Sequence, residues 1–546
     1  MIVFGSRGSD LALTQTRMVA AALARAAGCQ YRIEIIETRG DRVVDRPLPE
    51  IGGKGLFTQE LEDALRQGRI DVAVHSLKDL PVADPAGLTI GAVPERRDPG
   101  DVLVCQPQWF DRNGTVPLRS GCRVGTSSHR RRAALERLRP DLVFADVRGN
   151  VPTRVDKVRR GDYGAVVLAA AGLDRLQLPL GELVRAALPI EQFPPAPAQG
   201  ALGVQCRSGD TRVLAMLAQL HDAVADRCAR AERDVLFKLG GGCSMPLGVL
   251  VTDERDGFRL RAAFYSLPQP GHTPAGVFVD LRGRDPLALA EQVAARWRPL
   301  VDTPLAGRDV VLLRPDDGSR DLDDALAVAG ARVRRIALTR VVPIAGVAVD
   351  AATVQDRMLA FTSARAVELF CAAARVDLRG RSAFAGGPAT AAAVHAHGMT
   401  PIAATLGSGG RALAERIRTS PPPAGILFPC AEERHPDLED GLRAAQIAVV
   451  PLPVYRTEQL PPNAVDVPAG ATVVFASPSA VRAWAAAPRP RARHVAIGQS
   501  TAAAMRDAGV PCDAVADEPT AAGLIRSLEV VSQCPAPPRS TGPGPL

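Results

Sequence analysis

The chain has 546 residues, too many for a single hydrophobic core, and its length predicts several domains. Its composition, 46% hydrophobic and 23% charged, is typical of a globular protein, and no apolar run is long enough to span a bilayer. The net charge of +7 could suit nucleic acid. Aromatic residues, on which unpaired bases stack, are only 4% of the chain, and this disfavours that class.

The first residues, MIVFGSRGSDLAL, lack the charged start, apolar run and cleavage site of a secretory signal, so we expect a cytoplasmic protein. The ten cysteines and eight histidines are dispersed, with no C-x-x-C pair and no group at metal-ligand spacing. We therefore expect neither a disulfide framework nor a metal site.

Two α/β regions are predicted between the N-terminus and a proline-rich hinge at 193–197. Short apolar runs alternate with helical patterns, which is typical of mostly parallel sheets covered by helices. In the first region we expect strands at 33–36 and 71–74 and a helix at 56–67. In the second region we expect strands at 102–104, 123–125, 142–144 and 165–168.

A third region, from about 217 to 302, has a different pattern. It predicts a helix at 222–239, a Gly-Gly-Gly-Cys turn, strands of antiparallel character and a final helix that ends near Trp297. A new α/β pattern starts at 309–314. From residue 301 to the end, 25 Lys/Arg stand against 24 Asp/Glu, so this half of the chain is nearly neutral.

The C-terminal half contains a near-repeat of strand-turn-helix patterns. One copy begins at 359–363 with a second pattern near 386–390, and the other begins at 473–477 with a second pattern near 497–501. We interpret the repeat as two similar α/β subdomains that face each other. Pro343 and the stretch 451–453 are expected on strands that cross between them.

Positive charge is concentrated between Arg119 and Arg160, where 12 Lys/Arg stand against 4 Asp/Glu. A helix that starts near Ser127 would point free backbone N–H groups at an anion. The arginines of SSHRRR add planar forks that suit a carboxylate or a phosphate. A solvated helix start explains this motif equally well, but Arg148 and Arg154 follow the next strand, where an α/β cleft would lie.

Two further motifs suggest chemistry. His75-Ser76-Leu77-Lys78-Asp79 follows a predicted strand, and Asp79 could stabilise a developing cation or move a proton. Cys243 follows three glycines, which allow close approach of the backbone to a ligand, and its thiol could be a nucleophile or a covalent anchor. Each motif also has a structural explanation, a surface loop for the first and a buried inert cysteine for the second.

Eight motifs occur in order through residues 1–300: GSRGSDLAL, GDRVVDRPLPEIGGKGLF, DVAVHSLKDLP, RVGTSSHRRRAAL, VRGNVPTRVDKV, LAAAGLDRL, PAPAQGALGVQ and GGGCSMPLG. In this order they closely resemble hydroxymethylbilane synthase, also called porphobilinogen deaminase. Residues 303–530 are similar to uroporphyrinogen-III synthase through the weaker motifs FTSARAV, GGPATAAAV, LPVYRT, FASPSAV and AIGQSTAAAM. We therefore expect a fusion of the two enzymes.

The resemblance implies an α/β fold with two periplasmic-binding-protein-like α/β domains, a small α+β domain for cofactor attachment, and a two-subdomain α/β unit like uroporphyrinogen-III synthase. The implied bounds are 1–99 with about 197–216, 100–196, 217–302 and 303–530, followed by a disordered tail at 531–546. Within the C-terminal unit the subdomains are about 303–342 with 456–530, and 343–455.

The resemblance also implies the chemistry. The first enzyme, a transferase, would condense four porphobilinogens head to tail into hydroxymethylbilane, on a dipyrromethane cofactor attached to Cys243 by a thioether. Asp79 matches the catalytic aspartate. The other cofactor-binding positions are Lys54, Ser76, Lys78, Thr126, Ser128, Arg130 and Arg131. The substrate-binding positions are Arg7, Ser9, Arg148, Arg154, Arg175 and Gln199.

The second enzyme, a lyase, would close the linear product to uroporphyrinogen III with inversion of the last ring. Tyr455 is the best candidate for assisting loss of the hydroxyl group. Neutral hydrogen-bond donors occupy the matching substrate positions Thr362, Ser363, Thr390, Ser477 and Thr501. For each of these a helix N-cap is an equally good explanation.

Three alternatives stay open at this point. The C-terminal unit could be catalytically inactive. A solute-binding protein also has two α/β domains and a hinge, but that function leaves Asp79 and Cys243 unexplained and expects an export signal. A nucleic-acid binder is the weaker alternative. We expect a monomer that acts on small molecules, with no membrane or nucleic-acid partner.

Overall fold

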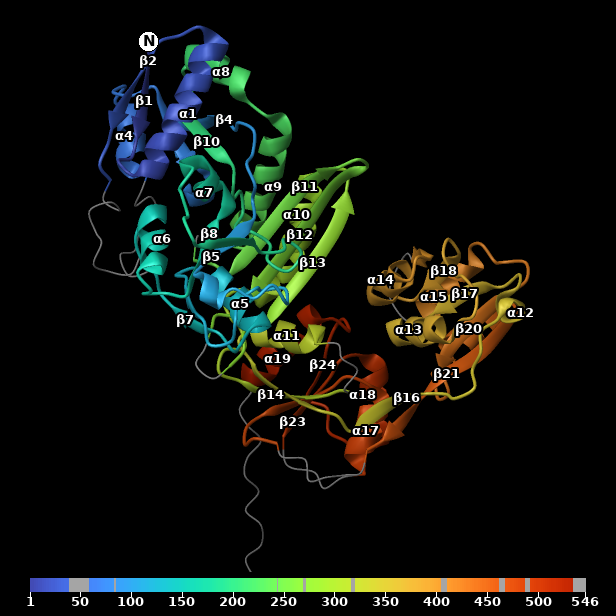
Figure 1. Cartoon of the computed structure of the whole chain (residues 1–546). Coiled ribbons are helices and arrows are strands. Elements are labelled where there is room, and N and C mark those ends of the chain that lie inside the picture. The colour runs from blue at the N-terminus through green and yellow to red at the C-terminus, as the bar shows by residue number, and fades with distance from the viewer. Residues whose placement is uncertain are drawn as a thin grey trace, which may run out of the picture. The chain divides into compact units, whose positions relative to one another are not determined.

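The computed structural model describes residues 1–38, 58–82, 85–242, 244–268, 272–315, 320–403, 410–460, 467–486 and 492–533. They divide into two compact units (Figure 1). Unit 1 contains residues 1–308, 320–332 and 520–533, and unit 2 contains 309–315 and 333–519. Among the described residues, no helix is both long and apolar enough to cross a bilayer.

The first sheet of unit 1 has the strand order β2-β1-β3-β10-β4. Its strands are β1 (Ile2–Ser6), β2 (Tyr31–Ile35), β3 (Val72–Ser76), β4 (Leu88–Ala92) and β10 (Leu202–Arg207). Its helices are α1 (Asp10–Ala27), α4 (Gln59–Arg66) and α8 (Thr211–Leu217), followed by the 3-10 turn η3 (Ala218–Leu220). Phe4 and Val74 of the strands and Leu23 of α1 belong to one buried core. The helix predicted at 56–67 begins at Gln59, and residues 56 and 57 lie outside the described residues.

The second sheet has the order β7-β6-β8-β5-β9. Its strands are β5 (Asp101–Cys105), β6 (Arg123–Gly125), β7 (Val143–Ala145), β8 (Ala165–Ala169) and β9 (Val184–Ala187). Between them lie η2 (Pro107–Trp109), α5 (His129–Leu138), α6 (Val151–Arg159) and α7 (Ala170–Leu176). Val124, Leu135 and Val167 lie in one core of this domain, and Val102, Val155 and Val166 lie in another.

Both sheets were predicted to be mostly parallel, and in each a single strand runs against the others. β10 pairs antiparallel with β3 and β4, and β5 pairs antiparallel with β8 and β9. These are the strands that follow the two crossings of the chain between the domains. Parallel neighbours need a crossover connection, and a strand that enters directly from the other domain has none.

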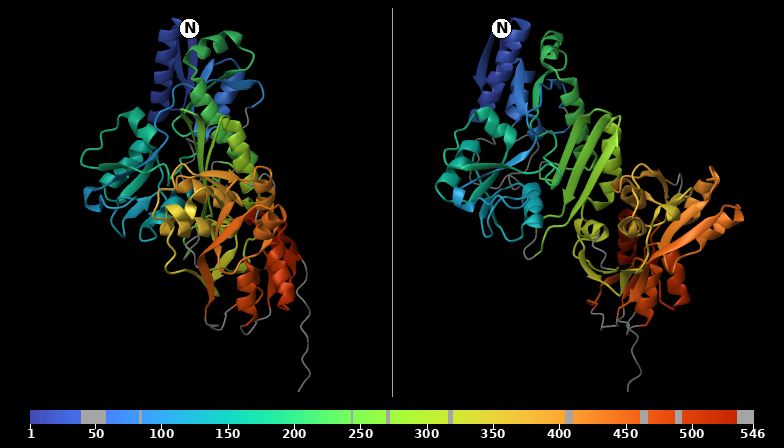
Figure 2. Two further views of the ribbon diagram at one scale, coloured as in Figure 1. Left: turned by 90° about the vertical axis from the view of Figure 1, so that its right-hand side faces the viewer. Right: turned by 45° about the vertical axis from the view of Figure 1, so that its right-hand side comes forward.

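The third sheet of unit 1 is antiparallel, as predicted, with the order β11-β12-β13. Its strands are β11 (Leu247–Glu254), β12 (Gly257–Tyr265) and β13 (Gly276–Gly283). Helices α9 (Ala223–Lys238) and α10 (Pro286–Trp297) pack side by side against this sheet, followed by η4 (Arg298–Leu300) (Figure 2). Asp222 caps α9 by accepting hydrogen bonds from the amides of Val224 and Ala225.

Two helices from the C-terminal half of the sequence also belong to unit 1. They are α11 (Asp321–Val328), which contacts β13, and α19 (Ala521–Gln533), which contacts η4. The tail predicted to be disordered from residue 531 is therefore helical as far as Gln533. The residues beyond Gln533 lie outside the described residues.

Unit 2 contains a six-stranded sheet with the order β16-β21-β20-β17-β18-β19. Its strands are β16 (Thr339–Pro343), β17 (Met358–Phe361), β18 (Ser382–Ala385), β19 (Thr400–Ala403), β20 (Ile426–Ala431) and β21 (Val449–Gln459). Its helices are α12 (Ala351–Val354), α13 (Ala364–Ala373), α14 (Pro388–Ala396), α15 (Gly410–Arg418) and α16 (Asp437–Ala444). Pro343 and the stretch 451–453 lie on the paired strands β16 and β21.

The second sheet of unit 2 has the order β15-β14-β22-β23-β24. Its strands are β14 (Asp309–Leu313), β15 (Arg332–Ile336), β22 (Thr472–Phe475), β23 (Arg493–Ala496) and β24 (Ala514–Val515), and its helices include α17 (Pro478–Ala485) and α18 (Gln499–Asp507). The succession β17-α13-β18-α14 in one sheet matches β22-α17-β23-α18 in the other. The predicted internal repeat of strand-turn-helix patterns is therefore present.

Candidate functional site

Asp79 lies at the carboxyl end of a strand of the first sheet. β3 ends at Ser76, and the chain then makes the single 3-10 turn η1, Leu77–Asp79. The side chain of Leu77 is buried and its amide donates to the carbonyl of Ala201 at 3.0 Å, which fixes the turn. Asp79 is exposed, and its carboxylate accepts no hydrogen bond from any other described residue. This carboxylate is therefore available to a ligand.

The segment Thr126–Ser128 joins β6 to α5 in the second domain. Ser128 is the N-cap of α5 and its hydroxyl accepts from the amide of Arg131 at 3.4 Å. The hydroxyl of Thr126 accepts from the amide of Ser128 at 3.3 Å. Both hydroxyl groups thus accept hydrogen bonds from the local backbone at the start of α5.

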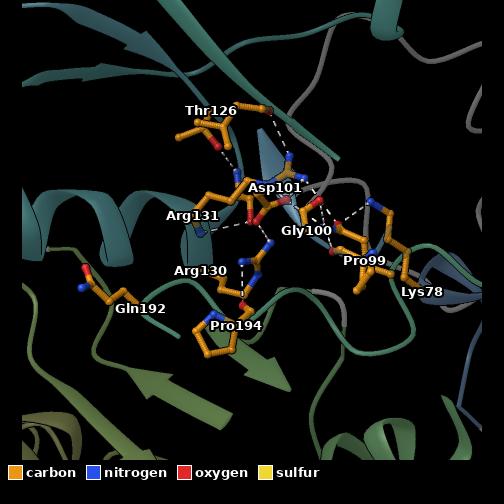
Figure 3. A network of polar contacts seen from close by, with 12 residues as sticks. Lys78, Pro99, Gly100, Asp101, Thr126, Arg130, Arg131, Gln192 and Pro194 are labelled. Atoms are coloured by element: carbon orange, nitrogen blue, oxygen red, sulfur yellow. Dashed lines mark hydrogen bonds and ion pairs between the residues drawn. The ribbon is translucent and has the colours of Figure 1, made fainter. Parts of the chain in front are cut away.

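Arg130 and Arg131 are buried and share one carboxylate, that of Asp101 at the start of β5 (Figure 3). Arg130 Nη2 donates to Asp101 Oδ2 at 2.8 Å, and Arg130 Nη1 donates to the carbonyl of Pro194 at 2.9 Å. Arg131 donates to Asp101 Oδ1 from Nη2 at 2.7 Å and from Nε at 3.1 Å. Two guanidinium groups face one carboxylate, so the group keeps a net positive charge.

Gln199 connects this charged group to the loop that carries Asp79. Its Nε2 donates to Asp101 Oδ1 at 2.8 Å and to the carbonyl of Pro99 at 2.7 Å. Its Oε1 accepts from Lys78 Nζ at 3.1 Å and from Arg131 Nη2 at 3.4 Å. Gln199 was predicted from its motif, but Asp101 was missed. The only sequence signal for Asp101 was an acidic residue directly before a buried apolar strand.

The electrostatics of the group follow from its burial. Burial by itself would raise the pKa of Asp101, but Arg130 and Arg131 hold it well below its usual range. Burial lowers the pKa of Lys78, and repulsion from Arg131 adds to this effect, while Asp79 acts in the opposite direction. A low dielectric strengthens each of these interactions. The result is a region of positive potential beside an exposed carboxylate.

The remaining predicted arginines differ in their surroundings. Arg154 Nε donates to the carbonyl of Gly149 at 2.8 Å, and burial with repulsion from Arg131 and Arg148 lowers its pKa to about 10. Arg175 is buried and donates from Nη2 to the carbonyl of Gly200 at 2.7 Å, while its Nε has no partner among the described residues. Burial lowers the pKa of Arg175 to about 10. Both groups stay charged near neutral pH.

Three predicted residues lie along the first sheet. Ser9 is the N-cap of α1 and accepts from the amide of Ala12 at 3.4 Å. Ser76 exchanges hydrogen bonds with Gln15 of α1, as the acceptor at 3.1 Å and as the donor at 3.4 Å. Arg7 directly follows β1 and is half-buried. Its positive charge helps to lower the pKa of His75 in β3.

Lys54 and Cys243, both predicted to bind the cofactor, lie outside the described residues. The residue that follows Cys243 is described, and it shows a contact that sequence reasoning missed. His129 Nδ1, at the start of α5, lies 3.2 Å from the carbonyl oxygen of Ser244. The turn after the three glycines therefore lies beside the arginine-rich helix, 115 residues away in sequence.

In unit 2 the structure brings together Ser363 and Tyr455, whose hydroxyl oxygens are 3.5 Å apart. Ser363 is also the N-cap of α13 and accepts from the amide of Ala366 at 3.1 Å. Thr362 is half-buried beside it, and Thr390 is buried near the start of α14. β17, β18, β20 and β21 run parallel, so these residues share the carboxyl edge of the sheet.

Ser477 and Thr501 occupy the equivalent positions on the other sheet of unit 2. Ser477 is the N-cap of α17, accepts from the amide of Ala480 at 3.2 Å and contacts the hydroxyl of Ser479 at 2.9 Å. Thr501 is buried in α18. Ser363 and Ser477 therefore both cap helices, and among the described residues only Ser363 has a tyrosine hydroxyl as a partner.

Comparisons with known proteins match the N-terminal and C-terminal parts of the chain to two different families. The family model described as porphobilinogen deaminase, dipyromethane cofactor binding domain, matches residues 2–215. The porphobilinogen deaminase of Roseiflexus sp. (strain RS-1) is 49% identical over 263 residues, which are 48% of this chain and 84% of that relative. The chain belongs to the porphobilinogen deaminase family. The relative from Moorella thermoacetica is 44% identical over 54% of this chain and 92% of its own length.

The C-terminal half matches a second family. The model described as uroporphyrinogen-III synthase HemD matches residues 347–526. Crystal structures of uroporphyrinogen-III synthetase from Helicobacter pylori 26695 and of a mutant uroporphyrinogen III synthase from Thermus thermophilus are each 17% identical and are covered to 99%. They cover 41% and 42% of this chain with TM-scores of 0.30 and 0.28, too low to support a conclusion.

The chain thus joins a porphobilinogen deaminase domain, a transferase, to a uroporphyrinogen-III synthase domain, a lyase, and is a bifunctional enzyme of tetrapyrrole biosynthesis. The predicted fusion is confirmed, as is the dipyrromethane cofactor of the first enzyme. The alternative of a non-enzymatic anion-binding protein is excluded.

Proposed function

We propose that Asp79 is the catalytic carboxylate of the first enzyme. The observation that carries this proposal is its placement: an exposed carboxylate without a hydrogen-bond partner among the described residues, next to Lys78 and the buried group Arg130, Arg131 and Asp101. A carboxylate so placed can stabilise a positive charge that develops on a pyrrole. It needs no prior release from another side chain.

The positive groups around Asp79 hold the carboxylates of the growing chain. Arg131 uses most of its N–H donors on Asp101, Val167 and Gln199, while Arg130 donates to Asp101 and to the carbonyl of Pro194. Arg154 and Arg175, whose pKa values are lowered by burial, would gain most from an added anion. We therefore assign Arg130 and Arg131 mainly to maintaining the positive potential of the site. Arg154 and Arg175 are assigned to direct binding of the carboxylates.

The residues present fit a dipyrromethane cofactor, which carries carboxylates. The buried Nε of Arg175 lacks a partner among the described residues, and Lys78, Arg130 and Arg154 add positive charge along the same domains. Cys243 is the proposed anchor, since the described Ser244 beside it lies against His129 of α5. When bound, the cofactor supplies the pyrrole carbon to which the first substrate unit is joined.

Each elongation step releases ammonia from the aminomethyl group of porphobilinogen. The methylene carbon left behind forms a carbon–carbon bond to the free α-carbon of the terminal pyrrole, which then loses its proton. Asp79 is assigned to stabilise the pyrrole cation as the carbon–nitrogen bond breaks, and the arginines hold the acidic side chains in place. After four units, hydrolysis releases hydroxymethylbilane.

In the second enzyme, Tyr455 is assigned to assist loss of the hydroxyl group from hydroxymethylbilane. Its hydroxyl lies 3.5 Å from Ser363 Oγ, which keeps it at the carboxyl edge of the sheet. Thr362, Thr390, Ser477 and Thr501 are assigned to neutral hydrogen bonding of the substrate. The hydroxyl group leaves as water with a proton, and the methylene carbon left on the first pyrrole bonds to the substituted α-carbon of the last pyrrole. The bond from this carbon to its neighbouring methylene bridge then breaks and re-forms at the free α-carbon, which loses its proton.

Intact mass tests the anchor. The wild-type protein should exceed its sequence mass by two linked pyrrole units, and Cys243→Ser should lose this increment. Cys512→Ser, at an exposed free cysteine, is the matched control and should keep it. A folded wild-type protein without the increment would overturn the assignment of Cys243.

Product analysis tests the second enzyme. The full-length protein is incubated with porphobilinogen, the product is oxidised, and the uroporphyrin isomers are separated. We expect the type III isomer. Type I alone would mean that residues 303–530 are inactive.

The same proposal includes a monomeric enzyme in the cytoplasm that binds small molecules and no nucleic acid. Light scattering of the purified chain, cell fractionation and titration with labelled DNA and RNA test these three points. A stable dimer, a membrane-bound pool or salt-sensitive nucleic-acid binding would each contradict the corresponding point.

A further inference from the structure

One buried arginine outside the site described above contacts the loop that carries Asp79. Arg233 lies on α9 and is 8% exposed. Its Nη1 donates to the carbonyls of Leu77 at 2.7 Å and Leu80 at 3.2 Å. Its Nη2 donates to the carbonyls of Pro81 at 2.7 Å and Val82 at 3.3 Å. One guanidinium group therefore satisfies four backbone carbonyls on both sides of Asp79.

Apolar contacts accompany these hydrogen bonds. Leu77 and Leu80 are buried in a cluster with Ala225 and Ala229 of α9. Ala229 and Arg233 are four residues apart, so they lie on the same face of the helix. The loop is thus packed and hydrogen-bonded against a single face of α9, and Asp79 is left as its exposed member.

Helix α9 is itself fixed at the position next to Arg233. Glu232 is fully buried, and its carboxylate accepts from Arg96 at 2.6 and 2.9 Å, from the amide of Ala198 at 2.6 Å and from the amide of Val251 at 2.8 Å. These contacts tie α9 to the segment before β10 and to β11. Arg233 therefore extends from a part of the helix that has little freedom to move.

We propose that Arg233 is a positioning residue, which fixes the loop Leu77–Val82 to α9 and so sets the place of the Asp79 carboxylate. The chain of α9 continues into Gly240–Gly242, which directly precede Cys243 in the sequence. A planar fork can satisfy several carbonyls at fixed angles, whereas a lysine ammonium cannot do so with the same geometry. This inference rests on the proposed role of Asp79.

The test compares Arg233→Met and Arg233→Lys with Arg230→Met in the full-length protein. Arg230 lies on the same helix, is largely exposed and pairs with Asp226 at 2.7 Å, so it is the matched control. Intact mass gives the fraction that carries the cofactor. Consumption of porphobilinogen per cofactor-loaded molecule gives kcat and KM, and hydrogen exchange reports the amides of residues 77–80 and 82.

We expect Arg233→Met to lower kcat by about 10- to 100-fold, because a misplacement of about 1 Å at a catalytic group has effects of this size. KM should change by less than about twofold, since the carboxylate-binding arginines are untouched. Amides of the loop should exchange at least about tenfold faster. Arg233→Lys should recover part of kcat, and Arg230→Met should match the wild type in all three measurements.

Unchanged kcat and unchanged exchange in cofactor-loaded Arg233→Met would overturn the inference. If that variant does not fold, Arg233→Lys decides alone, because a wild-type kcat in it would also overturn the inference. An Asp79→Asn variant separates the two proposals. If it keeps the wild-type kcat, the role of Asp79 fails; if it loses kcat while Arg233→Met keeps it, only the role of Arg233 fails.

Discussion

Gln199 Nε2 donates a hydrogen bond of 2.8 Å to Oδ1 of Asp101, and this contact joins the two places where the chain crosses between the α/β domains. Asp101 opens β5, the first strand after the outward crossing. Gln199 lies shortly before β10, the first strand after the return. Both crossings therefore meet at a carboxylate that also neutralises part of the charge on Arg130 and Arg131.

Asp101→Asn should destabilise the second domain strongly. It leaves Arg130 and Arg131 buried without a counter-charge, and loss of one partner of a buried ion pair typically costs about 3–5 kcal/mol. Hydrogen exchange of the β5 amides measures the local free energy of unfolding. Asp141→Asn is the control, because Asp141 pairs with Arg139 at 2.7 Å on the surface, where about 0–1 kcal/mol is expected. Equal losses of unfolding free energy in both variants would contradict the expectation that the buried ion pair contributes more stability than the surface pair.

His75 should make the first domain less stable in acid. Burial lowers its pKa to about 4, the neighbouring Gln205 side chain opposes the shift, and Arg7 adds to it. An unfolded histidine titrates near 6.5, so between about pH 6.5 and pH 4 the unfolded state binds more protons and the free energy of unfolding falls as the pH falls. The neutral His75 makes its full contribution to the free energy of unfolding above about pH 6.5. By pH 4 the free energy of unfolding has fallen by about 3 kcal/mol for this reason.

The measurement is the free energy of unfolding of the wild type and of His75→Gln at several values of pH between 7 and 4. The wild type should lose about 3 kcal/mol more than the variant over this range. His435→Gln removes an exposed histidine of unit 2 and should leave the pH dependence of the first domain unchanged. Parallel pH curves for the wild type and His75→Gln would show that the imidazole is not buried in its neutral form.

Gly200→Ala should disrupt the return crossing. Gly200 has φ = +88°, a conformation that favours glycine, and a Cβ at this position would overlap the carbonyl oxygen of Arg97. Its own carbonyl accepts from Arg175, so the change also disturbs a proposed binding arginine. We expect a loss of more than about 2 kcal/mol in the free energy of unfolding. Gly209→Ala, where a Cβ meets nothing within 4 Å, should change it by less than about 0.5 kcal/mol.

Ser363→Ala and Ser477→Ala test the internal repeat of unit 2. Each removes a helix N-cap and should lower the free energy of unfolding of this unit by about 1 kcal/mol. Of the two serines only Ser363 contacts Tyr455, so Ser363→Ala should slow formation of the type III isomer more than Ser477→Ala does, and Tyr455→Phe should slow it further, by about 10- to 100-fold. The ratio of type III to type I uroporphyrin measures this effect. Similar ratios in both serine variants would argue against the role of Tyr455.

Much of this protein could be predicted from contiguous motifs. The motifs HSLKD, TSSHRRR and GGGC are each an uninterrupted run of four to seven residues. They indicated the family, the proposed catalytic aspartate and the proposed cofactor anchor. The helix starts at Asp222, Ser363 and Ser477 were also visible, because an N-cap depends on the three residues that follow it. Alternating apolar patterns indicated the sheets, including the antiparallel one.

The partners of the buried charges were decided by the tertiary structure. Arg131 and Asp101 are 30 residues apart, and Arg233 and Leu77 are 156 apart. Neither spacing has a sequence signal, because which carboxylate or carbonyl meets an arginine depends on the direction of β5 and on the packing of α9. The sequence by itself determined the family and the chemistry expected of it, since these depend on local motifs. The fold alone decided which carboxylates and carbonyls each buried arginine contacts, because burial and strand direction arise only after the chain has crossed twice between its domains.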